Sequence, residues 1–227
     1  MNLLLLGCGK TGSLVRDCAI ERKHQVRTLG TAENRDGSGL TTHSLADVDV
    51  VIDFTTPSAV LKNIEACVAA RKNIVVGTTG WYSELERVRG IVEQSGIGFV
   101  YGANFSFGVN LFFEIAELAA EALKHGYGGS IEEIHHVHKK DAPSGTAIKV
   151  QQLLEQRGGK KLGIASIRKD DVPGTHTISL DSEFDSLTLT HDSKSRRGFA
   201  QGAIKAAEWL SGKSGFYDFR EIFHEVR

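Results

Sequence analysis

Short apolar runs recur along the first hundred residues, and a longer amphipathic stretch separates each run from the next. Compact apolar runs are typical of strands that are buried on both faces of a parallel sheet. We therefore expect strands at Asn2–Gly7, Gln25–Leu29, Asp49–Phe54, Asn73–Gly77 and Ile97–Tyr101. Helices should fill the intervals, because strands that alternate with helices form βαβ units.

The interval from Pro57 to Arg71 carries the clearest helical pattern. Thr56 is suited to cap this helix, and proline is favoured in a first helical turn. The apolar residues of one helical face are Ala59, Val60, Ile64, Cys67 and Val68. The pattern predicts an α/β domain.

The pattern changes after Tyr101. A helix is expected at about Val109–Lys124, followed by a glycine-rich turn at 126–129 and a helix that begins near Ser144. Alternating or compact apolar runs predict further strands at Ile131–His138, Ile164–Arg168, Thr175–Asp181 and Ser186–His191. These strands indicate an antiparallel or mixed sheet in a second domain. A last helix is expected at about Phe199–Leu210.

Composition narrows the class of protein. The chain has 227 residues, of which 41% are hydrophobic and 24% charged, as expected for a globular protein with one or two domains. A net charge of -1 gives no general attraction for nucleic acid. The three cysteines form no CxxC pair, which indicates reduced thiols in the cytoplasm. No apolar run approaches the roughly 20 residues that span a bilayer.

The first expected strand leads into Gly7-Cys8-Gly9-Lys10-Thr11-Gly12, a GxGxxG sequence where a strand turns into a helix. Glycines allow a tight turn and bring the backbone close to a pyrophosphate, and the helix N-terminus offers N–H groups and a partial positive charge. The position predicts a dinucleotide site in a Rossmann-type domain. A glycine-rich loop without a ligand is the alternative interpretation.

The sequence does not choose between NADH and NADPH. The acidic residue that binds the adenosine ribose usually lies at the end of the second strand, which here reads Thr28-Leu29-Gly30-Thr31. Glu33 lies beyond that end, and Arg35 would suit a 2′-phosphate. Both residue types are also common in solvated loops.

Titratable side chains are concentrated from Glu132 to Asp141, just before an expected helix start. If the strand extends that far, alternation places His135 and Lys139 on one face and His136 and His138 on the other. A proton-transferring group and a cation would then converge.

Ser144, Gly145 and Thr146 open the following helix, whose unpaired N–H groups suit a carboxylate. The alternatives are that Ser144 only caps the helix and that the histidines are hydrogen-bonded structural residues. Zinc is also conceivable, but adjacent strand residues point in opposite directions and no matching cysteine or carboxylate set is evident, so no metal is predicted.

The segment from His135 to Ala147 resembles the His-His-x-x-Lys-x-Asp-Ala-Pro-Ser-Gly-Thr-Ala signature of the dihydrodipicolinate (4-hydroxy-tetrahydrodipicolinate) reductase family. The likeness extends over nearly the whole chain. Its further motifs are Val51-Ile52-Asp53-Phe54-Thr55, Gly77-Thr78-Thr79-Gly80, Ala103-Asn104-Phe105-Ser106 and Phe199-Ala200-x-Gly202-Ala203.

The resemblance implies that NADH or NADPH reduces a cyclic unsaturated imine dicarboxylate to tetrahydrodipicolinate, in lysine and diaminopimelate biosynthesis. It implies that His135 is the catalytic acid/base and Lys139 its proton-donating or charge-stabilising partner. The substrate carboxylates would be held by His136, Ser144, Gly145 and Thr146. The cofactor would be held by Gly7, Cys8, Gly9, Lys10, Thr11, Gly12, Gly77, Thr78, Thr79, Gly102, Ala103, Asn104 and Phe105.

The pattern and the resemblance together divide the chain. A dinucleotide-binding domain is expected at 1–106, completed by 197–227, and a substrate-binding and catalytic domain at 107–196. Family members are commonly tetramers, but the stretch from Arg168 to Asp185 is shorter than in many members, which leaves a dimer equally open. No nucleic-acid or membrane partner is expected.

Three other functions compete with this interpretation. A diaminopimelate or aspartate dehydrogenase would share the first domain but oxidise an amine. A regulatory module could bind the dinucleotide without turnover, because GxGxxG indicates binding and not chemistry. A metal-dependent hydrolase could use the histidine cluster, and stoichiometric zinc would identify it.

Overall fold

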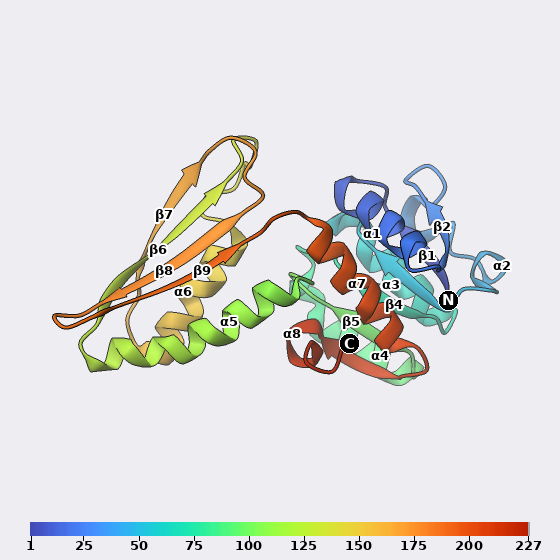
Figure 1. The fold of residues 1–227 in the computed structure, drawn as a ribbon. Coiled ribbons are helices and arrows are strands. Elements are labelled where there is room, and N and C mark those ends of the chain that lie inside the picture. The colour runs from blue at the N-terminus through green and yellow to red at the C-terminus, as the bar shows by residue number, and fades with distance from the viewer. Residues whose placement is uncertain (227) are drawn as a thin grey trace. The chain divides into compact units, whose positions relative to one another are not determined.

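The computed structural model describes residues 1–226, which form two compact units (Figure 1). The first unit contains Met1–Phe107 and the C-terminal stretch that begins at Arg197. The second unit contains Gly108–Arg196. Both ends of the chain therefore contribute to one unit, and the middle of the chain forms the other.

The first unit contains a six-stranded sheet in which every neighbouring pair is parallel. The strand order is β10-β5-β4-β3-β1-β2. The strands are β1 (Asn2–Leu6), β2 (Gln25–Leu29), β3 (Val50–Asp53), β4 (Asn73–Val76), β5 (Gly98–Tyr101) and β10 (Gly215–Asp218). The five strands predicted from apolar runs are confirmed.

Helices cover both faces of this sheet. Leu3 and Leu5 of β1 pack in one cluster with α1 and α7, and Leu4 and Leu6 pack in another with α3 and α4. This two-sided burial is why the strands are continuously apolar. The helices are α1 (Lys10–Glu21), α2 (Thr42–Leu45), α3 (Pro57–Ala69), α4 (Leu85–Ser95), α7 (Arg197–Leu210) and α8 (Phe219–Ile222), with 3₁₀ turns η1 (Arg35–Gly37) and η2 (Tyr82–Glu84).

Helix α3 begins as predicted, with Thr56 at the N-cap position and Pro57 in the first turn. The Thr56 side chain does not cap the helix; its hydroxyl lies 3.0 Å from that of Ser58. Asn63 is fully buried among the apolar residues of the inner face. A buried amide requires hydrogen-bond partners, which the site described below supplies.

Strand β10 was not expected from the sequence. Its residues are all half-buried, so the Gly215–Asp218 segment shows neither a compact apolar run nor a clear alternation. It pairs with β5 at the edge of the sheet, where Phe216 stacks on Phe99 with ring centroids 4.8 Å apart. Packing against a neighbouring strand, and not local pattern, determines this element.

The second unit contains a four-stranded mixed sheet in the order β7-β6-β8-β9. Strands β6 and β7 are parallel, and the other neighbouring pairs are antiparallel. The strands are β6 (Gly128–His135), β7 (Gly163–Arg168), β8 (Thr175–Asp181) and β9 (Ser186–Asp192). The sequence predicted an antiparallel or mixed sheet, and the sheet is mixed.

Helices α5 (Phe107–Ala119) and α6 (Gly145–Gly158) cover one face of this sheet (Figure 1). The continuous helix predicted at 109–124 is confirmed as far as Ala119 and wrong from Ala120 on, where a 3₁₀ segment, η3 (Ala120–His125), replaces the α-helix. Gly158 of α6 lies close to η3, since an added Cβ would be 2.6 Å from the Ala120 carbonyl oxygen. None of the helices in residues 1–226 is long and apolar enough to cross a membrane.

Strand β6 ends at His135, so the predicted strand through His138 is wrong. The chain turns after His135, and the Lys139 amide donates to the His136 carbonyl at 3.1 Å. The sheet cannot continue there because the His136 amide is paired with Val172, outside the strands, at 2.8 Å. Strand alternation therefore does not place Lys139 on the face of His135.

Candidate active site

The glycines of the first loop have different steric roles. Gly7 has φ of 89°, and an added Cβ would overlap the Phe54 carbonyl oxygen. A Cβ on Gly12 would overlap the Gly7 carbonyl oxygen, whereas Gly9 has no atom within 4 Å of its Cβ position. Gly7 and Gly12 are thus required by the fold itself, while Gly9 leaves space beside the helix N-terminus.

The N-terminus of α1 suits a diphosphate. Gly9 is its N-cap, no side chain caps the helix, and no acidic residue occupies its first turn. Unpaired N–H groups and the helix dipole favour an anion at such an end. Cys8 and Lys10 are exposed beside it, and Thr11 is half-buried. These residues fit the dinucleotide predicted from GxGxxG.

Phe54, directly after β3, contacts the other loops expected to bind the cofactor. Its carbonyl leaves no room for a side chain on Gly7, and its ring leaves none on Gly77. Its ring centroid lies 6.3 Å from that of Phe105. These loops follow β1, β4 and β5 at the carboxyl edge of the sheet. Strand β2 lies on one side of β1 and β3 on the other, so the order in which the chain adds strands reverses at β1. Ligands of open α/β sheets bind outside the carboxyl ends of the strands at such a point.

A buried carboxylate organises the same edge. Asp53 is fully buried, and its Oδ1 accepts hydrogen bonds from the hydroxyls of Thr55 and Thr78, each at 2.7 Å. Its Oδ2 accepts from the Asn63 amide at 2.7 Å. The Thr78 hydroxyl therefore faces inward, toward this carboxylate. Asp53 ends the buried apolar strand β3; it was quoted from the sequence within a family motif and given no role.

The remaining residues of the expected cofactor site differ in exposure. Phe105 is buried, with 2% of its surface exposed, so its ring belongs to the core. Ala103 is exposed, and the Asn104 side chain accepts a hydrogen bond from the Ser106 amide at 2.9 Å. At the end of β2, the Glu33 carboxylate accepts from the Gly30 amide at 2.8 Å. Arg35 begins η1 nearby in the chain.

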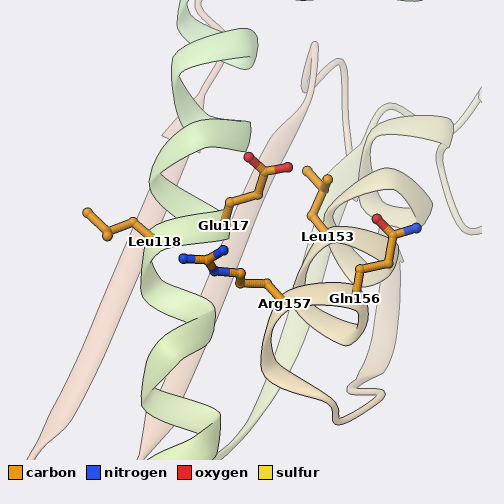
Figure 2. A pocket seen from close by; sticks show the side chains of 5 residues that line it. All are labelled: Glu117, Leu118, Leu153, Gln156 and Arg157. Atoms are coloured by element: carbon orange, nitrogen blue, oxygen red, sulfur yellow. The ribbon is translucent and has the colours of Figure 1, made fainter.

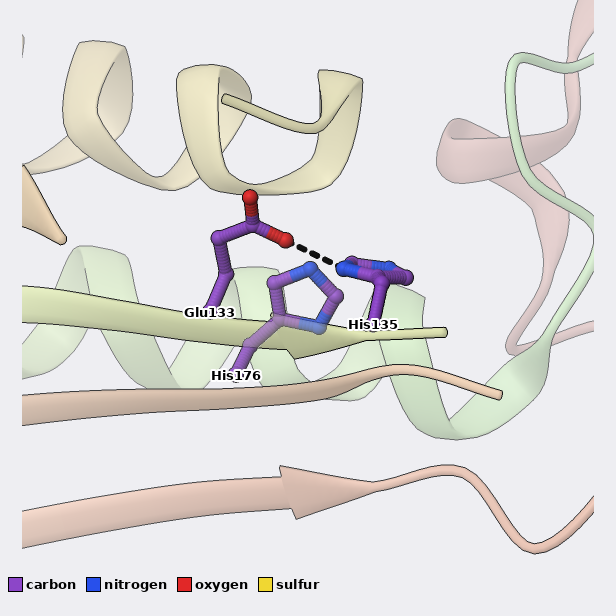
Figure 3. A group of neighbouring side chains, drawn as sticks. All are labelled: Glu133, His135 and His176. Carbon is purple, nitrogen blue, oxygen red and sulfur yellow. Dashed lines mark hydrogen bonds and ion pairs between the residues drawn. The ribbon is translucent and has the colours of Figure 1, made fainter. Parts of the chain in front are cut away.

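In the second unit, a carboxylate and an imidazole form a buried pair (Figure 3). Glu133 and His135 lie two residues apart on β6, so their side chains share one face, and Glu133 Oε2 is hydrogen-bonded to His135 Nδ1. Arg168, the last residue of β7, donates from Nη2 to the other Glu133 oxygen at 2.9 Å. Sequence reasoning missed Glu133 and Arg168, although the spacing of Glu133 and His135 was visible.

The surroundings set the charges of this pair. Burial raises the pKa of Glu133, but hydrogen bonds from Arg168, Ser166 and His135 outweigh it and hold that pKa below its usual value. Burial lowers the pKa of His135, and the nearby charges of Lys139 and Arg168 act in the same direction. Glu133 partly offsets this lowering. The pair is therefore an ionised carboxylate beside an imidazole that is readily neutral.

A second buried histidine, His176 on β8, was also missed. Its ring lies beside that of His135 (Figure 3), with the two centroids 5.1 Å apart. Its Nε2 lies 3.1 Å from the Ser144 hydroxyl. Burial, followed by the charge of His135, lowers the pKa of His176 to about 4. Its Nδ1 has no hydrogen-bond partner among the described residues. His176 is thus a neutral residue that holds Ser144.

Lys139 reaches this site through a turn. Its ammonium donates to Asp141 Oδ1 at 2.8 Å, and its charge contributes to the lowered pKa of both His135 and His176. The Asp141 carbonyl accepts from Arg168 Nη2 at 2.7 Å. Lys139 is therefore near enough to His135 for its charge to act there, although strand alternation does not bring it to that face.

The expected carboxylate-binding residues gather at the start of α6. Ser144 is the N-cap, and its hydroxyl accepts from the Ala147 amide at 3.2 Å. Gly145 is exposed and Thr146 is half-buried in the first turn, where no acidic residue lies. His136 lies beyond the end of β6, with its Nε2 2.9 Å from Arg196 Nη2.

The carboxylate and the two imidazoles also have the donor atoms of a metal site. One such atom from each of Glu133, His135 and His176 lies within 4.8 Å of the others. The first two are instead paired with each other, and the cations Arg168 and Lys139 lie beside them. Positive neighbours oppose the binding of another cation, so the arrangement favours proton chemistry.

A separate groove lies between α5 and α6 (Figure 2). Its volume is about 460 Å³. The lining side chains are Glu117, Leu118, Leu153, Gln156 and Arg157. None of them was predicted as a site residue.

Comparison with known proteins gives matches over nearly the whole chain. Residues 1–105 match the family model "Dihydrodipicolinate reductase, N-terminus", and residues 108–223 match "Dihydrodipicolinate reductase, C-terminus". The 4-hydroxy-tetrahydrodipicolinate reductase of Christiangramia forsetii is 37% identical, covering 100% of this chain and 99% of the relative. That of Neisseria meningitidis serogroup A is 38% identical over 78% of this chain and 73% of its own.

Solved structures share the fold. The dipicolinate-bound dihydrodipicolinate reductase from Paenisporosarcina sp. TG-14 aligns with a TM-score of 0.79 at 24% identity, covering 98% of this chain and 99% of that chain. Aspartate dehydrogenase from Thermotoga maritima aligns with a TM-score of 0.52 at 12% identity, covering 94% of this chain and 97% of that one. At these identities the likeness concerns architecture alone.

Proposed function

Because this chain belongs to the dihydrodipicolinate reductase family, we propose how its residues carry out the reaction of that family. It is a 4-hydroxy-tetrahydrodipicolinate reductase, an NAD(P)H-dependent oxidoreductase of lysine and diaminopimelate biosynthesis. The observation that carries the residue assignments is the buried Glu133–His135 pair on the same unit as the start of α6, where Ser144 is the N-cap and no acidic residue lies in the first turn.

We assign the dinucleotide to the first unit and the substrate to the second. Gly7 to Gly12 would hold the diphosphate against the N-terminus of α1, with the loops after β4 and β5 completing the site. When bound, the nicotinamide supplies a hydride. The support for this assignment is the open position at Gly9 and the absence of an acidic or capping side chain at α1.

We assign the two substrate carboxylates to His136, Ser144, Gly145 and Thr146. The first turn of α6 offers backbone N–H groups, and the dipole of this helix favours a negative charge there. His176 supports the assignment, because a neutral imidazole at 3.1 Å orients the Ser144 hydroxyl without adding charge. A dipicolinate-bound relative with this fold is consistent with a cyclic dicarboxylate as substrate.

His135 is the proposed acid/base, with Lys139 as its charged partner. Reduction at C4 of the cyclic imine leaves an enamine, which takes a proton at the adjacent carbon. Histidine suits this transfer, because its ordinary pKa lies near cellular pH. The rate then depends on how the imidazole is placed against the carbon that takes the proton. Lys139 would stabilise negative charge that develops on the substrate or donate a proton.

The cofactor is a nicotinamide dinucleotide, and we propose that both NADH and NADPH are accepted. Glu33 is fixed by the Gly30 amide after β2, where a carboxylate can accept from ribose hydroxyls. Arg35 follows two residues later and can pair with a 2′-phosphate. Comparison of the two dissociation constants in wild type and in Arg35→Gln tests this, and we expect the substitution to weaken NADPH alone.

We also propose a homo-oligomer, either a dimer or a tetramer. Apolar side chains remain exposed on the second unit, with exposed fractions of 38% for Ile167, 44% for Leu187 and 88% for Phe184. Exposed apolar side chains favour association with another copy. Light scattering should give a multiple of the 24.7 kDa chain mass, and a single 24.7 kDa species would contradict the proposal.

Cofactor absorbance provides the functional test. We expect purified protein to oxidise NADH or NADPH only with freshly generated pathway substrate, and pyridine-2,6-dicarboxylate to inhibit competitively as a planar mimic. An amino-acid dehydrogenase would instead reduce its cofactor with diaminopimelate or aspartate. Activity with an amino acid and none with the cyclic imine would reject the proposal.

A further inference from the structure

Glu133 is a fully buried carboxylate with both oxygens engaged. One oxygen is bonded to His135 Nδ1, and the other accepts from Arg168 Nη2 at 2.9 Å. Leaving a buried charge without partners is costly, so these two contacts define how the carboxylate is oriented. Glu133 has no role in the reaction described above.

The two partners determine where His135 carries its proton. Arg168 can only donate hydrogen bonds, and an ionised carboxylate can only accept them. A neutral imidazole facing this carboxylate therefore carries its hydrogen on Nδ1, which leaves Nε2 able to accept a proton. Gly174 lies against that nitrogen, since an added Cβ would be 2.8 Å from His135 Nε2.

Arg168 also reaches the segment that carries Lys139. The same Nη2 donates to the Asp141 carbonyl at 2.7 Å, and the Asp141 carboxylate accepts from Lys139 at 2.8 Å. One guanidinium thus connects the support of His135 with the turn that presents Lys139. Arginine suits such a link, because its planar group presents several donors in fixed directions.

We propose that Glu133 and Arg168 are positioning residues of this reductase: Glu133 holds the proton of neutral His135 on Nδ1, and Arg168 holds Glu133 and the Lys139 turn in one arrangement. The inference rests on the proposed role of His135. Neither residue is assigned a contact with substrate or cofactor. Both act through groups that do the chemistry.

The charges around His135 give the direction of the effect. Glu133 acts from β6, Arg168 from β7 and Lys139 from the following turn, and the neutral His176 ring faces it from β8. Of these groups, only Glu133 favours the protonated imidazole. Removal of its charge should therefore lower the pKa of His135 further.

Glu133→Gln is the decisive variant, because it keeps size and removes charge. The amide oxygen must face the donors of Arg168, so the amide N–H faces His135 Nδ1 and moves the imidazole proton to Nε2. Nitrogen NMR of the histidine ring should report this change of tautomer. We expect kcat to fall by about tenfold or more, as for loss of an orienting partner, while KM stays within about threefold.

Two matched controls accompany it. Glu132→Gln removes a carboxylate from the exposed face of the same strand and should leave tautomer and kcat unchanged. Arg168→Gln should lower kcat by about tenfold, whereas Lys169→Gln, an exposed neighbour, should not. Each pair of variants removes the same charge inside and outside the site, so an effect on kcat that depends on position is distinguished from one caused by the loss of charge alone.

The outcomes distinguish this inference from the proposed function. If wild type does not reduce the cyclic imine, the function fails whatever the tautomer. If wild type is active, an unchanged tautomer in Glu133→Gln, or a kcat that does not fall, overturns the positioning role. Should that variant not fold, the wild-type spectrum decides, because a neutral His135 with its proton on Nε2 contradicts the inference.

Discussion

His135 is the residue on which the proposed chemistry depends most. It lies at the end of β6, with 8% of its surface exposed, between a carboxylate on its own strand and a histidine on the next. Burial and two nearby cations lower its pKa, so the neutral form is accessible near cellular pH. The protonation of His135 therefore depends on side chains from β6, β7 and β8 and from the turn after β6.

Removal of either proposed acid/base group should slow turnover without loss of cofactor. We expect His135→Ala and Lys139→Ala each to lower kcat by about a hundredfold or more, as is typical of general acid–base groups. Cofactor dissociation constants from calorimetry should stay close to wild type, because both residues lie on the second unit. Normal turnover in both variants would refute the assignment. Lys140→Ala, an exposed neighbour, is the control.

His176 makes a prediction about stability and pH. Its pKa of about 4 in the folded chain lies below the ordinary 6.5, so between these values the unfolded chain binds a proton that the folded chain does not. Stability should therefore fall as pH falls from about 6.5 to about 4, by roughly 3 kcal/mol at most from this residue. Urea unfolding of His176→Gln should lack this component, whereas exposed His138→Gln should retain it.

Sequence reasoning named candidate residues within one motif and missed the buried groups that contact them. His135, Lys139 and Ser144 stand in one contiguous segment, so a motif identifies them. Arg168 and His176 come from β7 and β8, and only the pairing of these strands with β6 brings them to that segment. Sheet register across tens of residues is not encoded in local pattern.

Among the elements, the glycine loop and the ends of the strands hold the proposed site residues. The buried parallel strands were predictable, because burial on both faces leaves a continuous apolar run. The end of β6 was not, because polar residues continue past His135 and the turn depends on backbone pairing with Val172. Strand β10 was not predictable for the related reason that an edge strand carries a weak pattern.

The glycine loop allows a matched test of ligand and fold. Gly9→Ala meets no atom within 4 Å and keeps an ordinary φ of −70°, so it should change the free energy of unfolding by less than about 0.5 kcal/mol. It should weaken cofactor binding by about tenfold or more, because the backbone can no longer approach the diphosphate.

Gly12→Ala should behave differently, since its Cβ would overlap the Gly7 carbonyl oxygen. We expect a destabilisation of about 1–3 kcal/mol in urea unfolding. Equal stability of the two variants would contradict the steric role given to Gly12. Unimpaired cofactor binding by Gly9→Ala would show that the loop is not a diphosphate site.

In the whole molecule, we assign cofactor binding to one unit and substrate binding and proton transfer to the other. The unit built from both ends of the chain contains the glycine loop, and the unit built from 108–196 contains His135, Lys139 and the proposed carboxylate site at the start of α6. This division has a sequence basis, because the change from buried parallel strands to alternating ones occurs after Tyr101. The return of α7 and β10 to the first unit depends on packing, and only the α7 segment was predicted as a helix.

The most direct test follows the two hydrogens into the product. NADH carrying deuterium at both C4 positions is mixed with the protein and the cyclic imine dicarboxylate in ordinary water, and the product is read by NMR. The account predicts one deuterium at ring C4 and a solvent proton at the adjacent carbon, with transfer slowed in His135→Ala. Product without deuterium at C4, or oxidation of the cofactor that does not require the cyclic dicarboxylate, would contradict it.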